Sequence, residues 1–261
     1  MDRILQAAQA IATARRTKER LAALPPELAL RDEAEGYEVQ RAVRDLLLPQ
    51  LGSLVGYKIG CTSNVMQQYL NIPHPCSGSV FERGVHQSGV KLPASDFVNV
   101  GVECEIGVKL ARDLAPGEGP FTAEWVAEAI EAYVPAIEIV DDRYVQWETL
   151  GAPTLVADDF FAAACVLGTA VPRREAPDVR EVAGRALING AEVGTGTGAD
   201  VLGHPHNALA WLANHLASEG KGLHKGQLVL TGSLVKTVWL KPGDKVVMEL
   251  AGLGTVEAEF T

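Results

Sequence analysis

The chain has 261 residues, of which 47% are hydrophobic and 21% are charged, a balance typical of a globular protein with many turns. Its formal net charge of -10, with lysines and arginines scattered along the chain, argues against partners such as nucleic acid or an anionic membrane. No segment reaches the roughly 18–20 apolar residues that cross a bilayer, and acidic residues near the N-terminus are unusual in a transit peptide, so we expect a cytoplasmic protein.

The first fifth of the chain is predicted to be helical. Apolar residues recur at helical spacing over 3–23 and 33–50, and a Pro-Pro step separates the two helices. After Gly52 the pattern changes to short apolar runs that glycine and proline interrupt. We therefore expect a helical N-terminal segment over 1–52 and a β-rich domain over 53–261, which together form one functional unit.

The rest of the chain alternates between strands and a few helices. The clearest predicted strand covers 98–110, where apolar residues alternate with polar ones or glycine. A helix over 123–133 and a mostly buried strand over 134–140 follow. An Asn-Gly step within 186–193 indicates a hairpin with a type I′ turn, and 206–217 is a helix with one apolar stripe. We expect an α+β fold in which the helical segment packs on a mixed, rolled sheet.

Three glutamates are candidate metal ligands. Side chains alternate across a strand, so Glu103 and Glu105 project from the same face with Cα atoms about 6.5–7 Å apart, and they can share one cation. Glu138 lies within an apolar strand, where a carboxylate needs a partner. Three carboxylates suit a hard octahedral cation such as Mg²⁺ or Mn²⁺. Two alternatives remain open, a solvated strand face for the first pair and a buried ion pair of Glu138 with Arg143 or a lysine.

Lys58 is a candidate for a substrate or proton-transfer role. In the strand over 54–60, bulky Tyr57 and Ile59 point to one face while Lys58 points to the other, between glycines. A lysine in a dry pocket exchanges protons, or it stays charged and binds a carboxylate. The alternative is a lysine whose ammonium reaches solvent.

Several other signals are given less weight. The glycine-rich run over 194–198 follows a hairpin instead of opening a βαβ unit, so it is interpreted as a tight loop rather than a dinucleotide site. His204 and His206 lie at a helix start, where capping competes with a ligand role. The four cysteines form no CxxC pair and are expected to be reduced thiols. Neither GxSxG nor HExxH occurs, so serine hydrolase and zinc protease chemistry have no support.

A set of motifs in order along nearly the whole chain resembles one enzyme family, the 2-keto-4-pentenoate hydratases and 4-oxalocrotonate decarboxylases of the fumarylacetoacetate hydrolase superfamily. The motifs are GYKIGCTS at 56–63, VECEI at 102–106, VPAIEIVDDRY at 134–144, ADDF at 157–160, GADVLGHPHNALAWLAN at 198–214 and TGSLVKTV at 231–238. Their order and combined length make chance similarity improbable.

The resemblance implies a core of the fumarylacetoacetate hydrolase C-terminal-domain type and an assembly of identical subunits, with a pathway partner enzyme as an added option. It also implies that the three glutamates bind Mg²⁺ or Mn²⁺ and that Lys58 faces a small 2-oxo acid substrate. The residues whose roles the resemblance implies are Lys58 and Asp158 as catalytic groups, Thr231, Gly232 and Ser233 as substrate-binding groups, and Glu103, Glu105 and Glu138 as metal ligands.

The chain departs from the family pattern at two positions. At Cys76, which we place at the substrate, hydratases are expected to carry an acidic residue and decarboxylases an aliphatic one. Asp159 stands where asparagine is more familiar, which adds negative charge near the site. A neutral cysteine is a poor base at pH ~7, so Cys76 is not expected to activate water.

The resulting prediction is a metal-dependent lyase that adds water to a 2-hydroxy-2,4-dienoate or 2-oxo-enoate in the breakdown of aromatic compounds. Decarboxylation of 4-oxalocrotonate is the main alternative. Hydrolysis of an acylpyruvate has less support, because the His-carboxylate pair that would position water has no HxxE counterpart near the N-terminus. A non-catalytic subunit that stabilises an active partner is a further alternative, against which the intact metal ligands speak.

Overall fold

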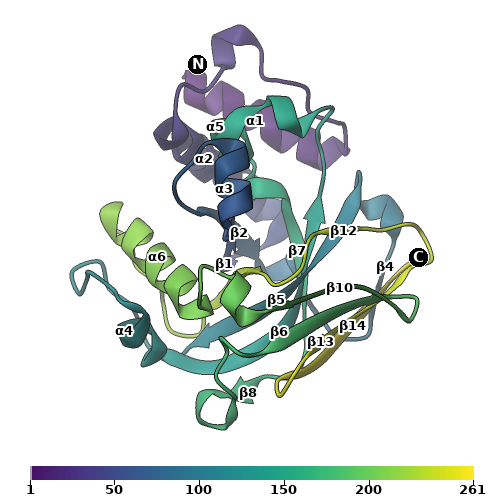
Figure 1. Ribbon diagram of the computed structural model, residues 1–261. Coiled ribbons are helices and arrows are strands. Elements are labelled where there is room, and N and C mark those ends of the chain that lie inside the picture. The colour runs from purple at the N-terminus through teal and green to yellow at the C-terminus, as the bar shows by residue number, and fades with distance from the viewer. Residues whose placement is uncertain (1) are drawn as a thin grey trace.

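A strongly curved sheet forms the centre of the molecule (Figure 1). The structure is a computed structural model, and it describes residues 2–261. The sheet has the strand order β2-β1-β11-β5-β6-β7-β3, with β12 added beside β5 and β8 beside β6, and it curls without closing into a barrel. Its strands are β1 (Leu54–Gly60), β2 (Cys76–Phe81), β3 (Val85–Gln87), β5 (Val100–Leu110), β6 (Ile130–Asp141), β7 (Ala162–Leu167), β8 (Val171–Pro172), β11 (Leu228–Ser233) and β12 (Val238–Trp239).

A second sheet of five strands packs against this one and completes the main core. Its order is β10-β9-β13-β14-β4. The Asn-Gly hairpin joins its first two strands as expected, because Asn189 and Gly190 both adopt positive φ angles, of 52° and 82°. The strands are β4 (Val90–Leu92), β9 (Ala183–Ile188), β10 (Ala191–Thr197), β13 (Lys245–Leu250) and β14 (Gly254–Phe260).

The helices gather mainly at the N-terminal end of the fold (Figure 1). Helix α1 packs on α2, and α2 in turn packs on α5, with an apolar cluster between the helices and the sheet. Asp32 begins α2 because its side chain accepts a hydrogen bond from the backbone of Glu35. The helices are α1 (Arg3–Thr17), α2 (Glu33–Leu51), α3 (Asn64–Leu70), α4 (Ala123–Ala127), α5 (Gly151–Ala157) and α6 (Pro205–Ser218).

The expected α+β class is confirmed, whereas three local predictions need correction. The helix expected over 123–133 ends at Ala127, because the following residues pair with β5 and this pairing overrides their helix propensity. The helix expected over 3–23 ends at Thr17, and Leu21 forms an isolated bridge with Tyr144. The glycine-rich run over 194–198, interpreted as a loop, belongs to β10 up to Thr197, and its last residue begins a short 3₁₀ helix.

The pairing register of the large sheet determines which side chains meet. Glu103 of β5 lies directly opposite Glu138 of β6. Lys58 of β1 lies opposite Gly78 of β2 on one side and opposite Leu230 of β11 on the other. These neighbouring strands therefore bring the predicted lysine and glutamates to one region of the sheet. Among the described residues, no helix combines the length and apolar composition that a bilayer crossing needs.

Candidate active site

Three carboxylates converge on one point between β5 and β6. Glu103, Glu105 and Glu138 each offer an oxygen that lies within 4.8 Å of the oxygens of the other two. Glu105 is 0% exposed and Glu138 is 1% exposed. The solvated strand face that was the alternative for Glu103 and Glu105 therefore does not describe Glu105. Within residues 2–261 this is the only group of three or more histidine, cysteine, aspartate or glutamate side chains that converges in this way.

The electrostatics of the three carboxylates fit a bound cation. Burial, followed by the neighbouring charge of Glu138, raises the pKa values of Glu105 and Glu103. Glu105 Oε1 and Glu138 Oε2 are buried and find no hydrogen-bond partner among residues 2–261. A buried oxygen of this kind normally has a partner, and a divalent cation with oxygen preference supplies one to each carboxylate. The donor set therefore fits Mg²⁺ or Mn²⁺.

The segment over 231–233 supports the position of Glu105. The backbone N–H of Gly232 donates to Glu105 Oε2 at 2.9 Å. Glycine is required there, because φ is 119° and a Cβ atom would lie 2.3 Å from Thr62 Oγ1. Thr231 Oγ1 donates to the carbonyl of Ile106 and Ser233 Oγ donates to that of Val235. Both hydroxyls thus bind the backbone, and the substrate-binding role of these three residues stays a prediction.

Lys58 is buried beside the glutamates, as the sequence suggested, and it does not extend to the surface. Its ammonium lies 2.9 Å from Glu138 Oε1, so the alternative pairing of Glu138 with a lysine is realised within the candidate metal centre. Burial alone would lower the pKa of Lys58, but the charges of Glu138 and the other glutamates outweigh this effect and raise it. A small cavity touches both Lys58 and Glu138.

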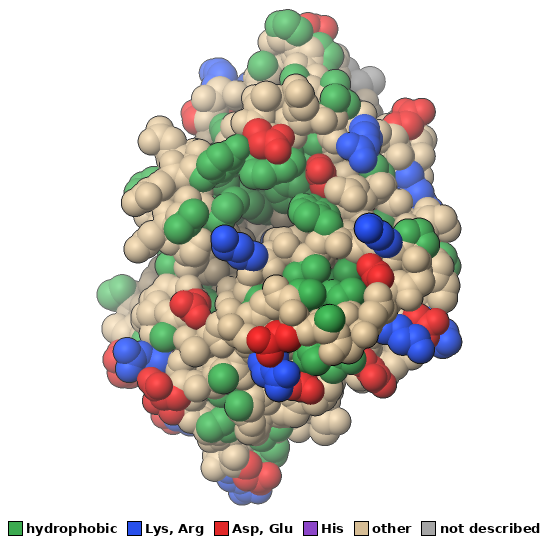
Figure 2. Space-filling model, turned by 45° about the vertical axis from the view of Figure 1, so that its right-hand side comes forward, with side chains coloured by type: hydrophobic (Ala, Val, Ile, Leu, Met, Phe, Trp, Pro, Cys, Tyr) green, Lys and Arg blue, Asp and Glu red, His purple; other side chains and the backbone are tan. Residues whose placement is uncertain are grey.

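A space-filling view shows a recess in one face of the molecule with hydrophobic side chains around it (Figure 2). A hollow that is larger than the cavity at Lys58 is lined by Ile130, Pro172 and Arg173 and lies near the start of β6, whereas Glu138 lies toward the end of that strand. This hollow brings none of the predicted site residues together, so the candidate site is the region around the three carboxylates.

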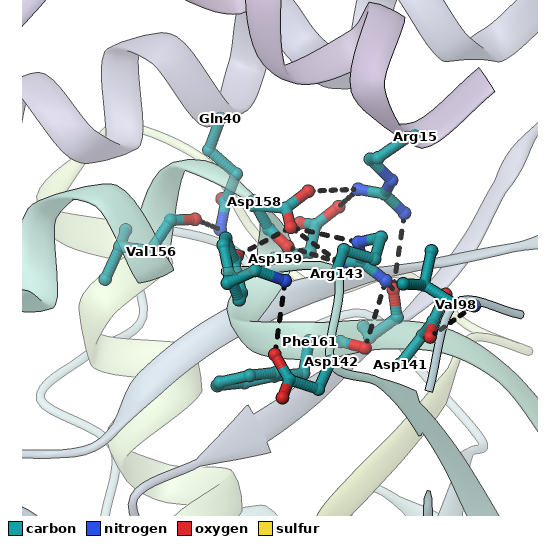
Figure 3. Close-up of polar contacts among 12 residues, drawn as sticks. Arg15, Gln40, Val98, Asp141, Asp142, Arg143, Val156, Asp158, Asp159 and Phe161 are labelled. Atoms are coloured by element: carbon teal, nitrogen blue, oxygen red, sulfur yellow. Dashed lines mark hydrogen bonds and ion pairs between the residues drawn. The ribbon is translucent and has the colours of Figure 1, made fainter. Parts of the chain in front are cut away.

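Asp158, the second predicted catalytic residue, lies in a buried ion-pair network between the helices and the sheet (Figure 3). Its Oδ2 accepts hydrogen bonds from Arg143 Nε at 3.0 Å, from Arg143 Nη2 at 2.8 Å and from the hydroxyl of Tyr144 at 2.6 Å. Arg143 is therefore the partner of Asp158 and not of Glu138. Whether Asp158 also acts on the substrate stays a prediction.

Asp159 joins the same network through a residue that the sequence did not single out. Arg15 of α1 donates to Asp159 Oδ2 at 3.1 Å, and the backbone N–H of Ser79 donates to Asp159 Oδ1 at 2.9 Å. The aspartate that departs from the family pattern thus has a nearly buried arginine as its partner. Arg15 belongs to a helix 144 residues away, so no local pattern could have indicated this contact.

Residues Asp159, Phe160 and Phe161 form a left-handed turn, with φ angles of 55°, 51° and 67°. Each non-glycine residue in this conformation costs roughly 1–2 kcal/mol, because its Cβ atom approaches a carbonyl oxygen. The hydrogen bonds of Arg15 and Arg143 help to stabilise the turn. Strained backbone of this kind often marks a functional site.

Cys76 lies at the start of β2, opposite Gly60, and is fully buried. It belongs to an apolar cluster that includes Cys61 and Tyr37. A hydrogen bond with Cys61 and burial raise the pKa of the Cys76 thiol well above its ordinary value. The thiol is therefore neutral at pH 7, which agrees with the expectation that it does not act as a base.

The two histidines at the start of α6 have local roles. His204 Nδ1 accepts a hydrogen bond from the backbone of His206 and so caps the helix. His206 Nε2 lies 2.7 Å from the hydroxyl of Tyr133. Burial lowers the pKa of His206 to about 4, so this ring is neutral at pH 7. Helix capping, one of the two alternatives considered, accounts for His204.

Comparison with known proteins places this geometry in context. The family model described as fumarylacetoacetate hydrolase C-terminal matches residues 82–261. The chain is 38% identical to a 2-keto-4-pentenoate hydratase of Paraburkholderia xenovorans over 79% of this chain and 76% of that protein. It is also 35% identical to a 2-hydroxyhexa-2,4-dienoate hydratase of Comamonas testosteroni over 80% of this chain and 78% of that protein.

A solved structure of a relative matches almost the whole fold. It is that of 4-oxalocrotonate decarboxylase from Pseudomonas putida complexed with magnesium and adipate, with a TM-score of 0.93 and 27% identity. The match covers 99% of this chain and 97% of that one. The helical N-terminal segment is therefore included in the likeness.

Proposed function

The chain belongs to the fumarylacetoacetate hydrolase C-terminal family, and on that premise we propose that it is a lyase that adds water to a 2-hydroxy-2,4-dienoate with the help of Mg²⁺ or Mn²⁺. The observation that carries the proposal is the convergence of Glu103, Glu105 and Glu138 beside the buried Lys58. Relatives named as hydratases support the reaction class, and the magnesium complex of the decarboxylase supports the cofactor.

Each residue of the site has a separate role in the proposed reaction. The three glutamates would hold the cation, which supplies Lewis-acid polarisation of a 2-oxo group when bound. Lys58 either donates a proton to the diene terminus or binds the substrate carboxylate, and both roles need the ammonium form that its raised pKa maintains. Because the Cys76 thiol is neutral and Lys58 stays charged, Asp158 remains the candidate group for activating water.

The distribution of buried cations favours hydration of a monocarboxylate over decarboxylation of 4-oxalocrotonate, which carries a second carboxylate. Among residues 2–261, Lys58 and Arg143 are the fully buried cationic side chains. Arg143 is occupied by Asp158, and the nearly buried Arg15 binds Asp159. Of these buried cations, Lys58 is thus the one beside the three glutamates. The second carboxylate of 4-oxalocrotonate would have no buried cation as its partner.

The remaining alternatives have less support. A non-catalytic subunit would have no need for three glutamates and a lysine in one buried cluster, and acylpyruvate hydrolysis would need a positioned base for water.

We also propose that the chain forms an assembly of identical subunits in the cytoplasm and takes part in the breakdown of aromatic compounds. Sedimentation of the purified protein would test the assembly.

A turnover assay tests the proposed function. The purified protein with Mg²⁺ is expected to consume 2-hydroxypenta-2,4-dienoate, followed by loss of its ultraviolet absorbance, and to yield the 4-hydroxy-2-oxo acid. Turnover should disappear after exhaustive chelation and return with Mg²⁺ or Mn²⁺. If the protein releases CO₂ from 2-oxo-3-hexenedioate with a higher kcat/KM than it shows for hydration of the dienoate, decarboxylation replaces hydration as the proposed function. Full activity after chelation would reject the metal mechanism.

Replacement of Cys76 by aspartate is expected to raise the ratio of hydration to decarboxylation by about tenfold or more, because a carboxylate can orient and deprotonate water whereas the neutral thiol cannot. The ratio of the two kcat/KM values measures the effect. Cys76→Asn is the control, since asparagine has the same shape without the charge. An equal rise in both variants would show that shape and polarity, rather than a base, limit hydration.

A further inference from the structure

The left-handed turn that follows α5 places one aromatic ring against the candidate catalytic lysine. The turn comprises Asp159, Phe160 and Phe161, and all three have a Cβ atom and a positive φ angle. Three consecutive residues in this conformation are unfavourable on their own, and such backbone persists only where its surroundings determine it. The contacts of the turn therefore show which groups stabilise this backbone and which side chain it positions.

The buried Arg143 and the nearly buried Arg15 both donate hydrogen bonds to the backbone at this turn (Figure 3). Arg143 Nη2 donates to the carbonyl of Asp158 at 3.1 Å, and its Nη1 donates to the carbonyls of Phe161 at 3.3 Å and Ala162 at 3.2 Å. Arg15 Nη2 donates to the same carbonyl of Ala162 at 3.3 Å. The backbone before and after Phe160 is thus restrained by charged donors, which form strong hydrogen bonds in a buried setting.

The restrained backbone directs the ring of Phe160 to the ammonium of Lys58. Lys58 Nζ lies over the ring, 5.8 Å from its centroid, within the range of a cation–π interaction. Glycine makes room for this arrangement, because a Cβ atom at Gly60 would lie 3.1 Å from Phe160 Cδ1 and 3.4 Å from Lys58 Nζ. A Cβ atom at Gly78 would lie 3.1 Å from the methylene groups of Lys58.

We propose that Phe160 is a positioning residue for Lys58, an inference that rests on the proposed role of Lys58 at the substrate. Glu138 attracts the ammonium from one side, and the face of the ring attracts it from another and restricts its movement. The strained turn orients the ring, and Arg15 and Arg143 maintain the turn. Lys58 then keeps one orientation relative to the three carboxylates.

Phe161 provides a matched control for Phe160. It shares the left-handed conformation, and its ring packs edge-on against Tyr144, Trp147 and the turn's other ring, Phe160, with centroids 5.2 Å, 5.7 Å and 5.8 Å away. Phe160→Leu removes the aromatic face and keeps an apolar side chain of similar size. Phe161→Leu makes the same chemical change at the neighbouring ring of the turn, whereas the ring under the Lys58 ammonium is that of Phe160. Phe160→Tyr keeps an aromatic face in place.

The first readout is the kinetics of dienoate hydration. Phe160→Leu is expected to lower kcat about tenfold with KM changed less than about threefold, because a misplaced lysine slows the chemical step more than binding. Phe160→Tyr and Phe161→Leu should keep kcat within about threefold of the unchanged protein. Equal losses in Phe160→Leu and Phe161→Leu would overturn the proposal, since both would then reflect general disruption of the turn.

The second readout does not depend on turnover. In the protein labelled with ¹³C-lysine, the Lys58 side-chain methylene protons should carry an upfield ring-current shift that Phe160→Leu removes and Phe161→Leu retains; Lys58→Met assigns the signal. Identical Lys58 shifts in the unchanged protein and in Phe160→Leu would overturn the proposal. If the protein does not hydrate a dienoate but the shift behaves as expected, the proposed function fails while the contact between ring and lysine stands.

Discussion

Glutamine in place of Glu105 is expected to lower kcat/KM by about 10³-fold or more and to weaken Mn²⁺ binding at least about 100-fold. The change removes one negative ligand while its carbonyl oxygen can still accept the hydrogen bond from the N–H of Gly232. It also leaves the ion pair between Lys58 and Glu138 intact. Titration with Mn²⁺, followed by calorimetry, and the hydration assay measure the two effects.

Glu131→Gln is the control for this substitution. Glu131 lies on β6 with Glu138, but it is exposed and pairs with Lys109. Its replacement should leave Mn²⁺ binding and turnover unchanged, because exposed ion pairs contribute little. If Glu105→Gln bound Mn²⁺ as tightly as Glu131→Gln does, the three carboxylates would not be the metal site.

Although Glu105→Gln is expected to weaken metal binding, it should raise the folding stability of the metal-free protein. Burial and the charges of Glu138 and Glu103 raise the pKa of Glu105 in the folded state. The unfolded chain releases this proton near pH 4.3, so folding stability falls as the pH rises above that value, and Glu105→Gln removes the effect. After chelation at pH 7 the variant should melt about 2–4 °C higher for each kcal/mol of repulsion relieved.

Methionine in place of Lys58 is expected to lower kcat by about 10²–10⁴-fold if the ammonium transfers a proton, and mainly to raise KM if it only binds the substrate carboxylate. Methionine is also unbranched and is one heavy atom shorter than lysine, so it fills most of the space between the glycines and Phe160. Affinity for Mn²⁺ should rise, because a cation 2.9 Å from Glu138 no longer competes. The kinetic split and the titration together assign the role of Lys58.

Lys109→Met is the matched control, because Lys109 is an exposed lysine on β5 that pairs with Glu131. It should leave kcat, KM and Mn²⁺ affinity within about twofold of the unchanged protein, as is usual for an exposed pair. Unchanged kinetics in Lys58→Met would remove this lysine from the reaction and leave it a structural partner of Glu138.

Local periodicity in the sequence was enough to predict several elements of the fold. The alternation over 98–110 indicated β5, and it placed Glu103 and Glu105 on one face because side chains of a strand alternate in direction. The Asn-Gly step predicted the hairpin between β9 and β10, since its turn type depends on those two residues alone. The apolar neighbours of Glu138 likewise indicated a carboxylate in need of a partner.

Tertiary structure decided what no local pattern contains. The register of β5 with β6 brings Glu138 opposite Glu103. The same pairing explains why the helix expected over 123–133 ends at Ala127 and a strand follows it. The pairing of Arg15 with Asp159, and the left-handed turn that sets Phe160 against Lys58, join elements that are far apart in the sequence.

There is a physical reason why local sequence patterns predict some features and tertiary structure decides others. Backbone conformation follows from neighbouring residues wherever one periodicity dominates, and β5, the Asn-Gly hairpin and α6 are such segments. Partner choice among buried charges depends instead on which strands and helices pack together, because a buried carboxylate must be compensated by whatever cation the fold brings within reach. The sequence by itself therefore determined the candidate ligands, and only the fold decided that Lys58 pairs with Glu138, Arg143 with Asp158 and Arg15 with Asp159.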